Sequence, residues 1–334
     1  MVTSASKPAA EVCFNLATNA MRRSGGSLPR GYLVLGAFRM HLGPTLIIDT
    51  FAEAFRMRYA RLIVTALDEF WLDAALREFC GYGSSVIGCD AEVGVERFLA
   101  PQETPDARPG AAVLAFGFSV DALAKAMLNR AGQCLLPCAT SAVFNGLPEG
   151  EDQVPLGKNL RFFGDGYQKS KLIGDRRYWR IPVMDGEFIA EEQVGVAKGV
   201  AGGNIIIQGE TQAIALAAAR RAVEAIADMP GVVTPFPGGV VRSGSKVGSK
   251  YKALRASSND AFCPTLRGRV PTELVAGAEC AYEIVINGVD EQHVAAATRA
   301  TLHAAAGDGI PAISAGNYGG KLGKFHFRLR DVLA

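Results

Sequence analysis

The 334-residue chain is predicted to be an α+β protein made of two similar ferredoxin-like (split βαβ) lobes. Three observations predict this class. Short runs rich in strand-forming residues alternate with helical apolar stripes, and the second half of the chain repeats the plan of the first. The composition, 49% hydrophobic with a net charge of +2, suits two packed cores and argues against disorder. The near-neutral charge also gives no general nucleic-acid-binding footprint.

Residues 1–39 are expected to be an extension outside the two lobes. The segment is rich in Ser, Ala and Arg and has no clear helical or strand period. The sequence is read as a loose tail or a mis-assigned start, with Met40 as the alternative beginning, and a docking arm for a partner subunit is the other interpretation. The remaining chain is predicted to divide into an N-terminal lobe, residues 40–183, and a C-terminal lobe, residues 184–334.

The N-terminal lobe is predicted to contain two strand–helix–strand units. Residues 61–66 are read as a strand, Asp68 as the cap of the next helix, and residues 84–89 as the returning strand. After a Pro-rich loop at 101–109, residues 111–116 are read as a strand and Ser119 as a second helix cap. Gly132 is expected to end that helix.

The C-terminal lobe is predicted to follow the same order. Residues 202–208 are read as a strand and residues 212–228 as a helix. The helix is expected to pair Arg220 with Glu224 on its outer face. Four of its residues are expected to point inward: Leu216, Ala219, Val223 and Ile226. The chain is expected to return through 231–235, with a strand around Tyr282, an Ala-rich helix at 290–306 and a closing strand at 324–329.

One carboxylate lies in an unexpected place, inside the apolar run 281–287. This run reads as a strand buried on both faces, yet it contains Glu283. A buried carboxylate is costly unless it is hydrogen-bonded or has a task. The alternative is an edge strand with Glu283 facing water.

A basic, Gly- and Ser-rich loop occupies residues 235–255. Five positive charges lie between residues 242 and 255 without an acid between them, at Arg242, Lys246, Lys250, Lys252 and Arg255. The loop nearly matches a phosphate loop, but Ser245 breaks the G-x-x-x-x-G-K-[ST] spacing, so a P-loop NTPase is excluded. It is read either as a solvated basic loop or as a clamp for an acidic or phosphorylated ligand tail.

Three further polar loops are candidates for ligand contact. They are residues 162–168 with Asp165, residues 257–264 with Ser257 and Asn259, and residues 313–323 with Asn317. For Asp165 a turn-stabilising Asx bond is the competing interpretation. None of these loops matches a nucleophile elbow, a Ser/His/Asp order or a dinucleotide fingerprint.

The sequence does not indicate a metalloprotein, a disulfide-stabilised protein or a membrane-spanning protein. The seven cysteines lack CxxC spacing and the histidines number four, so we expect no metal site and no disulfide framework. No apolar run approaches the ~20 residues that span a bilayer. We therefore expect a protein of the reducing cytoplasm that binds neither membrane nor nucleic acid.

Several long motifs follow one another from about residue 46 to the C-terminus, in order and without large gaps. Five of them are Ile48-Asp-Thr-Phe-Ala-Glu-Ala-Phe55, Gly199-Val-Ala-Gly-Gly-Asn204, Ser245-Lys-Val-Gly-Ser-Lys250, Tyr282-Glu-Ile-Val-Ile-Asn-Gly288 and Ser314-Ala-Gly-Asn-Tyr-Gly-Gly-Lys-Leu-Gly323. Taken together, these motifs resemble the formylmethanofuran–tetrahydromethanopterin formyltransferase family, in which the extension at 1–39 has no counterpart.

The resemblance implies an acyltransferase of one-carbon metabolism that binds no cofactor. Such an enzyme moves a formyl group reversibly between the amine of methanofuran and N5 of tetrahydromethanopterin. The resemblance also implies a homotetramer and, in bacterial relatives, a formyltransferase/hydrolase complex that oxidises formaldehyde-derived units, as in methylotrophy. The acidic tails of both carriers would suit the basic loop.

By the same resemblance Glu283 matches the proposed acid/base residue, and burial would raise its pKa towards the working range. Substrate binding is expected at Arg242, Ser245, Lys246, Lys250, Ser257, Asn259, Asp165 and Asn317. The oxyanion donors are sought at Asn259, Ser257 and the backbone around Gly316 and Gly319. Cys134 and Cys138 are read as packing residues.

Two other functions are also consistent with the sequence. One is a formyltransferase that uses a folate-type carrier, because the chemistry at N5 is the same. The other is a non-catalytic scaffold subunit of the one-carbon complex, against which the Gly-rich loops and Glu283 argue.

Overall fold

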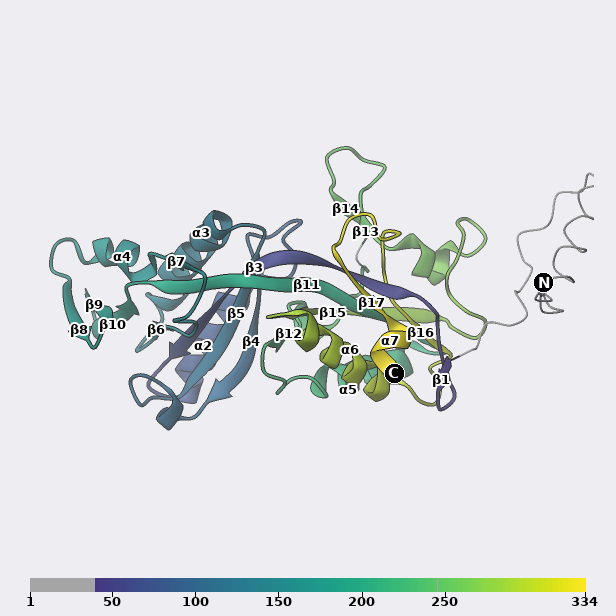
Figure 1. Cartoon of the computed structure of the whole chain (residues 1–334), viewed down its shortest axis with the longest axis horizontal. Coiled ribbons are helices and arrows are strands. Elements are labelled where there is room, and N and C mark those ends of the chain that lie inside the picture. Colours follow the sequence, from purple (N-terminus) through teal and green to yellow (C-terminus); the bar gives the residue numbers. More distant parts are fainter. Residues whose placement is uncertain (1–39, 245) are drawn as a thin grey trace, which may run out of the picture. The chain divides into compact units, whose positions relative to one another are not determined.

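A computed structural model describes residues 40–244 and 246–334, and the predicted α+β class is confirmed (Figure 1). The expectations for residues 1–39 and for Ser245 lie outside the described residues. The strands are β1 (Met40–Leu42), β2 (Thr45–Ile47), β3 (Phe51–Thr65), β4 (Glu92–Leu99), β5 (Gly110–Gly117), β6 (Ala142–Asn145), β7 (Asp152–Val154), β8 (Lys169–Ile173), β9 (Arg176–Val183), β10 (Gly186–Glu191), β11 (Val194–Gly209), β12 (Val232–Val233), β13 (Lys246–Val247), β14 (Ala256–Ser257), β15 (Cys280–Gly288), β16 (Ala312–Ser314) and β17 (Phe325–Arg328). The α-helices are α2 (Glu69–Cys80), α3 (Val120–Arg130), α4 (Leu156–Leu160), α5 (Gln212–Glu224), α6 (Glu291–Ala305) and α7 (Leu329–Leu333).

Two long antiparallel strands, β3 and β11, run through both halves of the fold (Figure 1). They lie side by side in a sheet whose main path is β1-β2-β16-β11-β3-β6-β10-β9-β8. Along β3, Ala52 and Ala54 pack in the core of the C-terminal half, whereas Leu62 and Val64 pack in the core of the N-terminal half. The lobe boundary at 183/184 stays a sequence prediction, and each long strand serves both cores.

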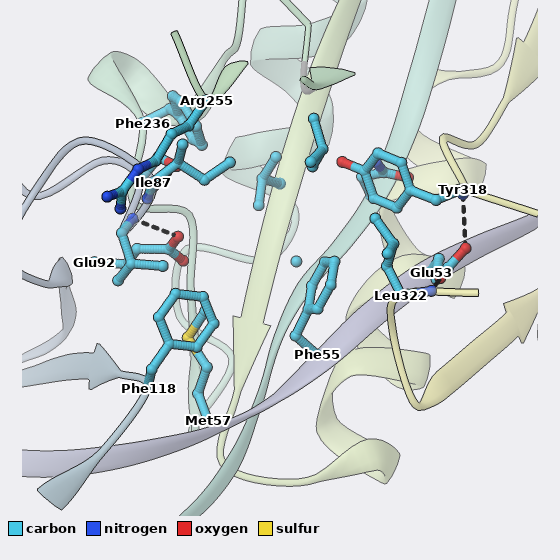
Figure 2. A pocket seen from close by; sticks show the side chains of 16 residues that line it. Glu53, Phe55, Met57, Ile87, Glu92, Phe118, Phe236, Arg255, Tyr318 and Leu322 are labelled. Atoms are coloured by element: carbon cyan, nitrogen blue, oxygen red, sulfur yellow. Dashed lines mark hydrogen bonds between the residues drawn. The ribbon is translucent and has the colours of Figure 1, made fainter. Parts of the chain in front are cut away.

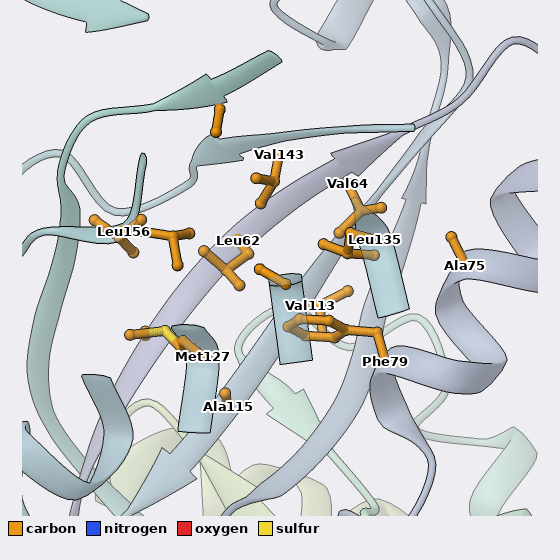
Figure 3. Close-up of a cluster of buried hydrophobic side chains, with 14 of the residues drawn as sticks. Leu62, Val64, Ala75, Phe79, Val113, Ala115, Met127, Leu135, Val143 and Leu156 are labelled. Atoms are coloured by element: carbon orange, nitrogen blue, oxygen red, sulfur yellow. The ribbon is translucent and has the colours of Figure 1, made fainter. Parts of the chain in front are cut away.

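The N-terminal core lies between the sheet and helices α2 and α3 (Figure 3). Asp68 caps α2 through a bond from Trp71 N, and Ser119 caps α3 through a bond from Ala122 N, as predicted. Phe79 of α2 is fully buried against this sheet, a burial that stabilises by about 1.5–3 kcal/mol. The predicted strand at 61–66 is the end of the longer β3.

Two predictions in this half are wrong. Residues 84–89 form turns, in which Gly88 N and Cys89 N donate to Ser85 O, and the returning strand is β4. The apolar pair Val86 and Ile87 thus faces a cavity instead of a sheet neighbour. Gly132 does not end α3 by itself, because residues Ala131–Leu135 continue it as a π-helical turn.

The C-terminal core lies between helices α5 and α6 and one face of strands β11 and β15. The helix starts, the β15 and β17 strands and the exposed Arg220–Glu224 ion pair (2.7 Å) are as predicted. Helix α5 ends at Glu224 rather than near residue 228. Leu216 is 46% exposed and not inward. The buried stripe of α5 consists of Ala215, Ala218, Ala219 and Ala222, whose small side chains allow close approach to the sheet.

Strand β15 divides its side chains between two different surroundings. Tyr282, Ile284 and Ile286 face the helices and join the C-terminal core. Glu283, Val285 and Asn287 alternate with them, so they face the opposite side of the sheet. In the contacts of the described chain, α5 and α6 pack against the other side, and loops with short 3-10 turns, among them Asp260–Phe262, cover this side (Figure 1). We call it the loop-covered face, and it holds the candidate site.

Candidate functional site

Glu283 lies buried on the loop-covered face with 3% of its surface exposed. Its backbone pairs with Ile206 of β11 on one side and with Val241 on the other. The edge-strand interpretation with Glu283 facing water is therefore wrong. The Glu283 Oε1 accepts a 2.7 Å hydrogen bond from Asn204 Nδ2, and Asn204 Oδ1 accepts from Gly316 N at 2.8 Å. The carboxyl is thus held in one orientation by an amide that is itself held by the backbone.

A cavity of ≈ 430 Å³ lies beside this pair on the same face (Figure 2). Its volume is typical of small-molecule sites. Apolar and aromatic side chains form most of its wall, from β3, β15, the 84–88 turn and the covering loops. They are Phe55, Met57, Val86, Ile87, Phe118, Phe236, Val247, Val285 and Leu322. Polar groups lie at its two sides, with Glu53 and Tyr318 on one and Glu92 and Arg255 on the other, and Asn204 also lines the cavity.

Glu53 holds the Gly-rich loop that covers one side of the cavity. Its carboxylate accepts four backbone bonds, from Tyr318 (2.6 Å), Gly320 (2.9 Å), Leu322 (2.7 Å) and Gly323 (2.6 Å). Burial by itself acts to raise the pKa of Glu53, but the four N–H donors together lower it below its ordinary value. A Cβ at position 323 would lie 2.4 Å from Ala54 O, so this close approach requires glycine.

Asn317, predicted as a substrate contact, fastens the same loop to β3. Its Nδ2 donates to Thr50 Oγ1 and Phe51 O, and its Oδ1 accepts from Gly319 N at 3.0 Å. The N–H groups of Gly316 and Gly319, considered as oxyanion donors, are therefore engaged with Asn204 and Asn317. The amides of both asparagines act within the protein in this structure.

Tyr318 was not singled out from the sequence, although it lies inside the Gly-rich motif. Its ring lines the cavity and lies 6.1 Å from the ring of Phe55. Burial raises the pKa of Tyr318 to about 12, and the nearby Glu283 and Glu53 carboxylates add to the rise. The phenol therefore stays protonated at neutral pH and can donate a hydrogen bond.

Glu92 was also missed, and it lines the other side of the cavity with 6% of its surface exposed. Its Oε2 accepts from Asn287 Nδ2 at 2.6 Å and its Oε1 from Val86 N at 3.1 Å. Burial raises the pKa of Glu92, and these two bonds lower it only in part. Asn287 is pinned in turn, because its Oδ1 accepts from Gly202 N at 2.9 Å.

A second, small recess of ≈ 30 Å³ opens at Glu283 from the other direction. Two predicted binding residues, Arg242 and Asn259, line it together with Glu283. Because Asn204 faces the larger cavity and is bonded to Glu283, the two spaces meet at this amide–carboxyl pair. The recess thus gives Glu283 a polar neighbourhood that the periodicity of its strand could not indicate.

The basic loop contributes unequally to the site. Arg255 lines the larger cavity, but Lys246 is engaged in a 2.6 Å ion pair with Asp260. The Ser257 hydroxyl donates to Gly248 O, so it braces the loop. Lys250 is exposed and lies apart from the lining of both spaces. The prediction for Ser245 falls outside the described residues.

Asp165 is not brought to Glu283 within one chain. It lies on the turn before β8, at the opposite end of the sheet path from β16, and takes the left-handed conformation (φ 49°). Its N–H donates to Phe162 O within the turn. The residue therefore has a local conformational role in the single chain, and a ligand contact there stays a prediction.

Outside residues 1–39 and 245, no group of three or more His, Cys, Asp or Glu side chains could hold a metal ion. Within the described part of the chain, no helix has the length and apolarity needed to cross a membrane. Cys134 and Cys138 are half-buried against the N-terminal core, and burial raises the pKa of both thiols. Both features fit packing rather than nucleophilic roles.

Comparison with known proteins gives a consistent result for nearly all of the described chain. Residues 40–183 match the family model described as formylmethanofuran-tetrahydromethanopterin formyltransferase, and residues 186–332 match the model described as its proximal lobe. The formylmethanofuran–tetrahydromethanopterin formyltransferase of Methylococcus capsulatus is 56% identical over 292 residues, which cover 86% of this chain and 98% of that protein.

Two solved structures are similar as well. One is the formylmethanofuran:tetrahydromethanopterin formyltransferase from Methanosarcina barkeri, with 47% identity and a TM-score of 0.83, covering 88% of this chain and 100% of that one. The other is the formyltransferase/hydrolase complex from Methylorubrum extorquens with methylofuran, with 46% identity and a TM-score of 0.85, covering 89% and 99%.

Proposed function

The chain belongs to the formylmethanofuran–tetrahydromethanopterin formyltransferase family, and we propose that it moves a formyl group between a methanofuran-type amine and N5 of tetrahydromethanopterin. The observation that carries the proposal is the buried Glu283–Asn204 pair beside an apolar cavity large enough for a carrier ring. This is the arrangement that transfer between two nitrogens needs, with one fixed proton carrier and a site shielded from water.

The reaction can be written without a covalent enzyme intermediate. The N5 lone pair attacks the formyl carbon of the formamide, and a C–N bond forms as the carbonyl becomes an oxyanion. The Glu283 carboxylate takes the N5 proton. When the tetrahedral intermediate collapses, the bond to the methanofuran nitrogen breaks and that nitrogen receives the proton back from Glu283. Atoms and charges balance, and the reverse reaction uses the same steps.

Asn204 is the positioning residue in this scheme. Its Nδ2 donates to Glu283 while its Oδ1 is fixed by Gly316 N, so the carboxyl is oriented before substrate arrives. For the oxyanion we assign the Asn259 side chain, which lines the recess together with Glu283. Each fixed donor of this kind typically contributes about 10²–10³ in rate.

Acidic tails of the carriers would meet the basic residues that surround the two spaces. Arg242 borders the recess and Arg255 the larger cavity, and Lys250 is exposed on the loop between them. Lys246 is less suited because Asp260 already neutralises it. We expect these contacts to weaken with added salt, as exposed charge pairs do.

We also propose that the chain acts in the cytoplasm as a homotetramer, within a formyltransferase/hydrolase assembly that oxidises formaldehyde-derived one-carbon units. The complex from Methylorubrum extorquens, to which the chain is similar over 89% of its length, supports the assembly. Mass measurement of the purified chain, alone and with the other subunits, tests the stoichiometry.

The direct test is formyl transfer from formylmethanofuran to tetrahydromethanopterin by the wild type and by Glu283→Gln. We expect transfer by the wild type and a loss of about 100-fold or more in the variant, the scale of general acid–base catalysis. Glu224→Gln is the matched control, because it makes the same change on an exposed helix face. It should leave transfer unchanged.

Each other outcome separates the alternatives. Activity that survives Glu283→Gln would keep the reaction and remove Glu283 from it. Faster transfer to tetrahydrofolate than to tetrahydromethanopterin would favour the folate-type carrier. Carrier binding without transfer by either protein would favour the scaffold subunit.

A further inference from the structure

The Glu92 carboxyl is a second buried acid at the cavity, and the transfer chemistry above does not use it. It enters from β4 of the N-terminal half, whereas Asn287, which holds it, comes from β15 of the C-terminal half. A buried acid that has neither a charged partner nor a full set of hydrogen-bond donors is costly. The position therefore calls for a ligand-directed explanation.

The placement of Glu92 relative to Glu283 follows from β15. Glu283 and Asn287 lie on the same face with Val285 between them, and four residues of strand span roughly 13 Å. Because Glu92 is bonded to Asn287, it lies towards the opposite end of the cavity from the reacting end. Figure 2 shows Glu92 with Ile87, Phe118 and Met57 around it, across the cavity from Tyr318 and Glu53.

The carboxyl retains acceptor capacity for a ligand. In the described part of the chain, each Glu92 oxygen accepts one hydrogen bond, from Val86 N and from Asn287 Nδ2. A carboxylate oxygen has two lone pairs, so one on each oxygen is left. The surrounding wall is apolar, and a ligand with two neighbouring donors would satisfy both oxygens at once.

We infer that Glu92 is the specificity residue for the carrier ring: it binds the pterin edge on which a ring N–H lies beside an exocyclic amino group. The inference rests on the proposed function, because it places N5 of the same ring near Glu283. Phe55 and Phe118 flank the space between and supply the flat apolar walls that a bicyclic ring requires.

Electrostatics agree with this arrangement. Without ligand, burial keeps the pKa of Glu92 above its ordinary value. Two donors from a pterin favour the charged form, and Arg255 on the same side of the cavity adds a positive charge. Ring binding and ionisation of Glu92 therefore support each other.

A fragment comparison tests the inference without using catalysis. Pterin carries the N–H/amino edge, whereas lumazine has an oxo group in place of the amino group. We expect the wild type to bind pterin about 10- to 100-fold more tightly than lumazine, the effect of replacing a donor to a charged acceptor with a repelling oxygen. Quenching of the intrinsic fluorescence of each fragment measures both affinities.

Two variants decide whether Glu92 is responsible. Glu92→Gln should lose the preference for pterin. Glu96→Gln should keep it, because Glu96 is an equally buried acid of the same strand that bonds Arg61 and Gly231 instead of facing the cavity. Equal binding of the two fragments by the wild type, or an unchanged preference in Glu92→Gln, would overturn the inference. Should Glu92→Gln fail to fold, Glu92→Asp replaces it, and an unchanged preference there would equally overturn it.

Steady-state kinetics give the second readout. In Glu92→Gln the KM for tetrahydromethanopterin should rise about 10- to 100-fold while the KM for formylmethanofuran stays unchanged. A general loss of folding would instead lower the active fraction and leave both KM values in place. Wild-type preference for pterin without any formyl transfer would refute the proposed reaction but not the edge recognition, so the two claims fail separately.

Discussion

The two faces of strands β11 and β15 differ sharply in what they bury. The face towards α5 and α6 holds Tyr282, Ile284 and Ile286 among other apolar side chains. The loop-covered face buries Glu283 and Asn287, which alternate with those apolar residues along the same strand. Helices offer apolar stripes and therefore select apolar partners, whereas loops offer backbone N–H groups and amides that can hold buried polar side chains. One strand thus contributes to the hydrophobic core on one side and to the proposed site on the other.

The comparison also separates two kinds of buried acid. Glu53 receives four backbone bonds and has a lowered pKa, whereas Glu92 receives two bonds and has a raised pKa. The first is fully used by the protein, and the second retains acceptor positions towards the cavity. Hydrogen-bond supply, more than burial alone, distinguishes a structural acid from one that can serve a ligand.

The largest stability effect should come from the helix-covered face. Ile284 is fully buried, so Ile284→Ala should lower the free energy of unfolding by about 2–5 kcal/mol. Formyl transfer per folded molecule should stay at the wild-type level below the unfolding transition. Urea unfolding and active-fraction titration measure the two quantities. An Ile284→Ala variant that is stable but inactive would contradict the claim that the helix-covered face contributes to stability and not to formyl transfer.

Glu53→Gln should destabilise by about 2–4 kcal/mol, because the amide NH2 replaces one carboxylate oxygen and leaves the two backbone N–H groups bonded to that oxygen without an acceptor. The sign of its pH dependence follows from the lowered pKa. The stabilising contribution of Glu53 is present above its unfolded value of 4.5 and is lost as the pH falls through the folded value. Thermal unfolding from pH 7 to pH 3 should therefore bring wild type and variant together, with surface Glu187→Gln as control. A stability difference between wild type and Glu53→Gln that stays constant from pH 7 to pH 3 would contradict the role given to the Glu53 carboxylate.

For Glu92 we predict that the contribution to folding stability depends on pH in the opposite direction. Its raised pKa means that its contribution is fully present below the unfolded value of 4.5 and is lost as the pH rises through the folded value. The stability of Glu92→Gln relative to wild type should accordingly improve as the pH increases from 4 towards neutrality. If both acids shifted stability in the same direction, their assignment to different roles would be wrong.

Asn204→Asp should lower kcat for formyl transfer by about 10- to 100-fold and change KM much less. The change replaces the 2.7 Å donor to Glu283 with a like charge, so one of the two carboxyls must be protonated. Asn159→Asp, on the exposed side of α4, is the matched control. Unchanged kcat in Asn204→Asp would exclude Asn204 as a positioning residue.

The smallest effect is expected on the outer surface. Arg220→Ala removes an exposed i,i+4 pair of α5 and should change stability by about 0.5 kcal/mol or less. Transfer should be unaffected. A larger loss would indicate that this helix face contacts another subunit in the assembly.

The sequence alone predicted the elements whose signals are local. Asp68 and Ser119 cap their helices because an N-cap acts within three residues. The strand around Glu283 was recognisable from its apolar run, and the unexpected carboxylate within it is the basis for the proposed site. The family resemblance then gave the chemistry that spacing and composition did not.

Long-range partners explain the failures. Strand β4 was missed because Glu92 and Glu96 interrupt its apolar pattern. Their main hydrogen-bond partners, Asn287, Arg61 and Gly231, lie far away in the sequence. Val86 and Ile87 were read as a strand because an apolar run does not reveal whether it faces a sheet or a cavity. The position of Tyr318 at the cavity was missed for the same reason, because the sequence does not show which surface a side chain faces.

A crystal structure of Glu283→Gln with formylmethanofuran and tetrahydromethanopterin tests the central claim most directly. We predict that the formyl carbon and N5 lie on the loop-covered face within hydrogen-bond reach of residue 283, at about 2.6–3.2 Å from its side chain to the reacting nitrogen. Carriers that meet at the Glu92 side instead, or outside the cavity altogether, would contradict the assignment of Glu283 as the proton carrier.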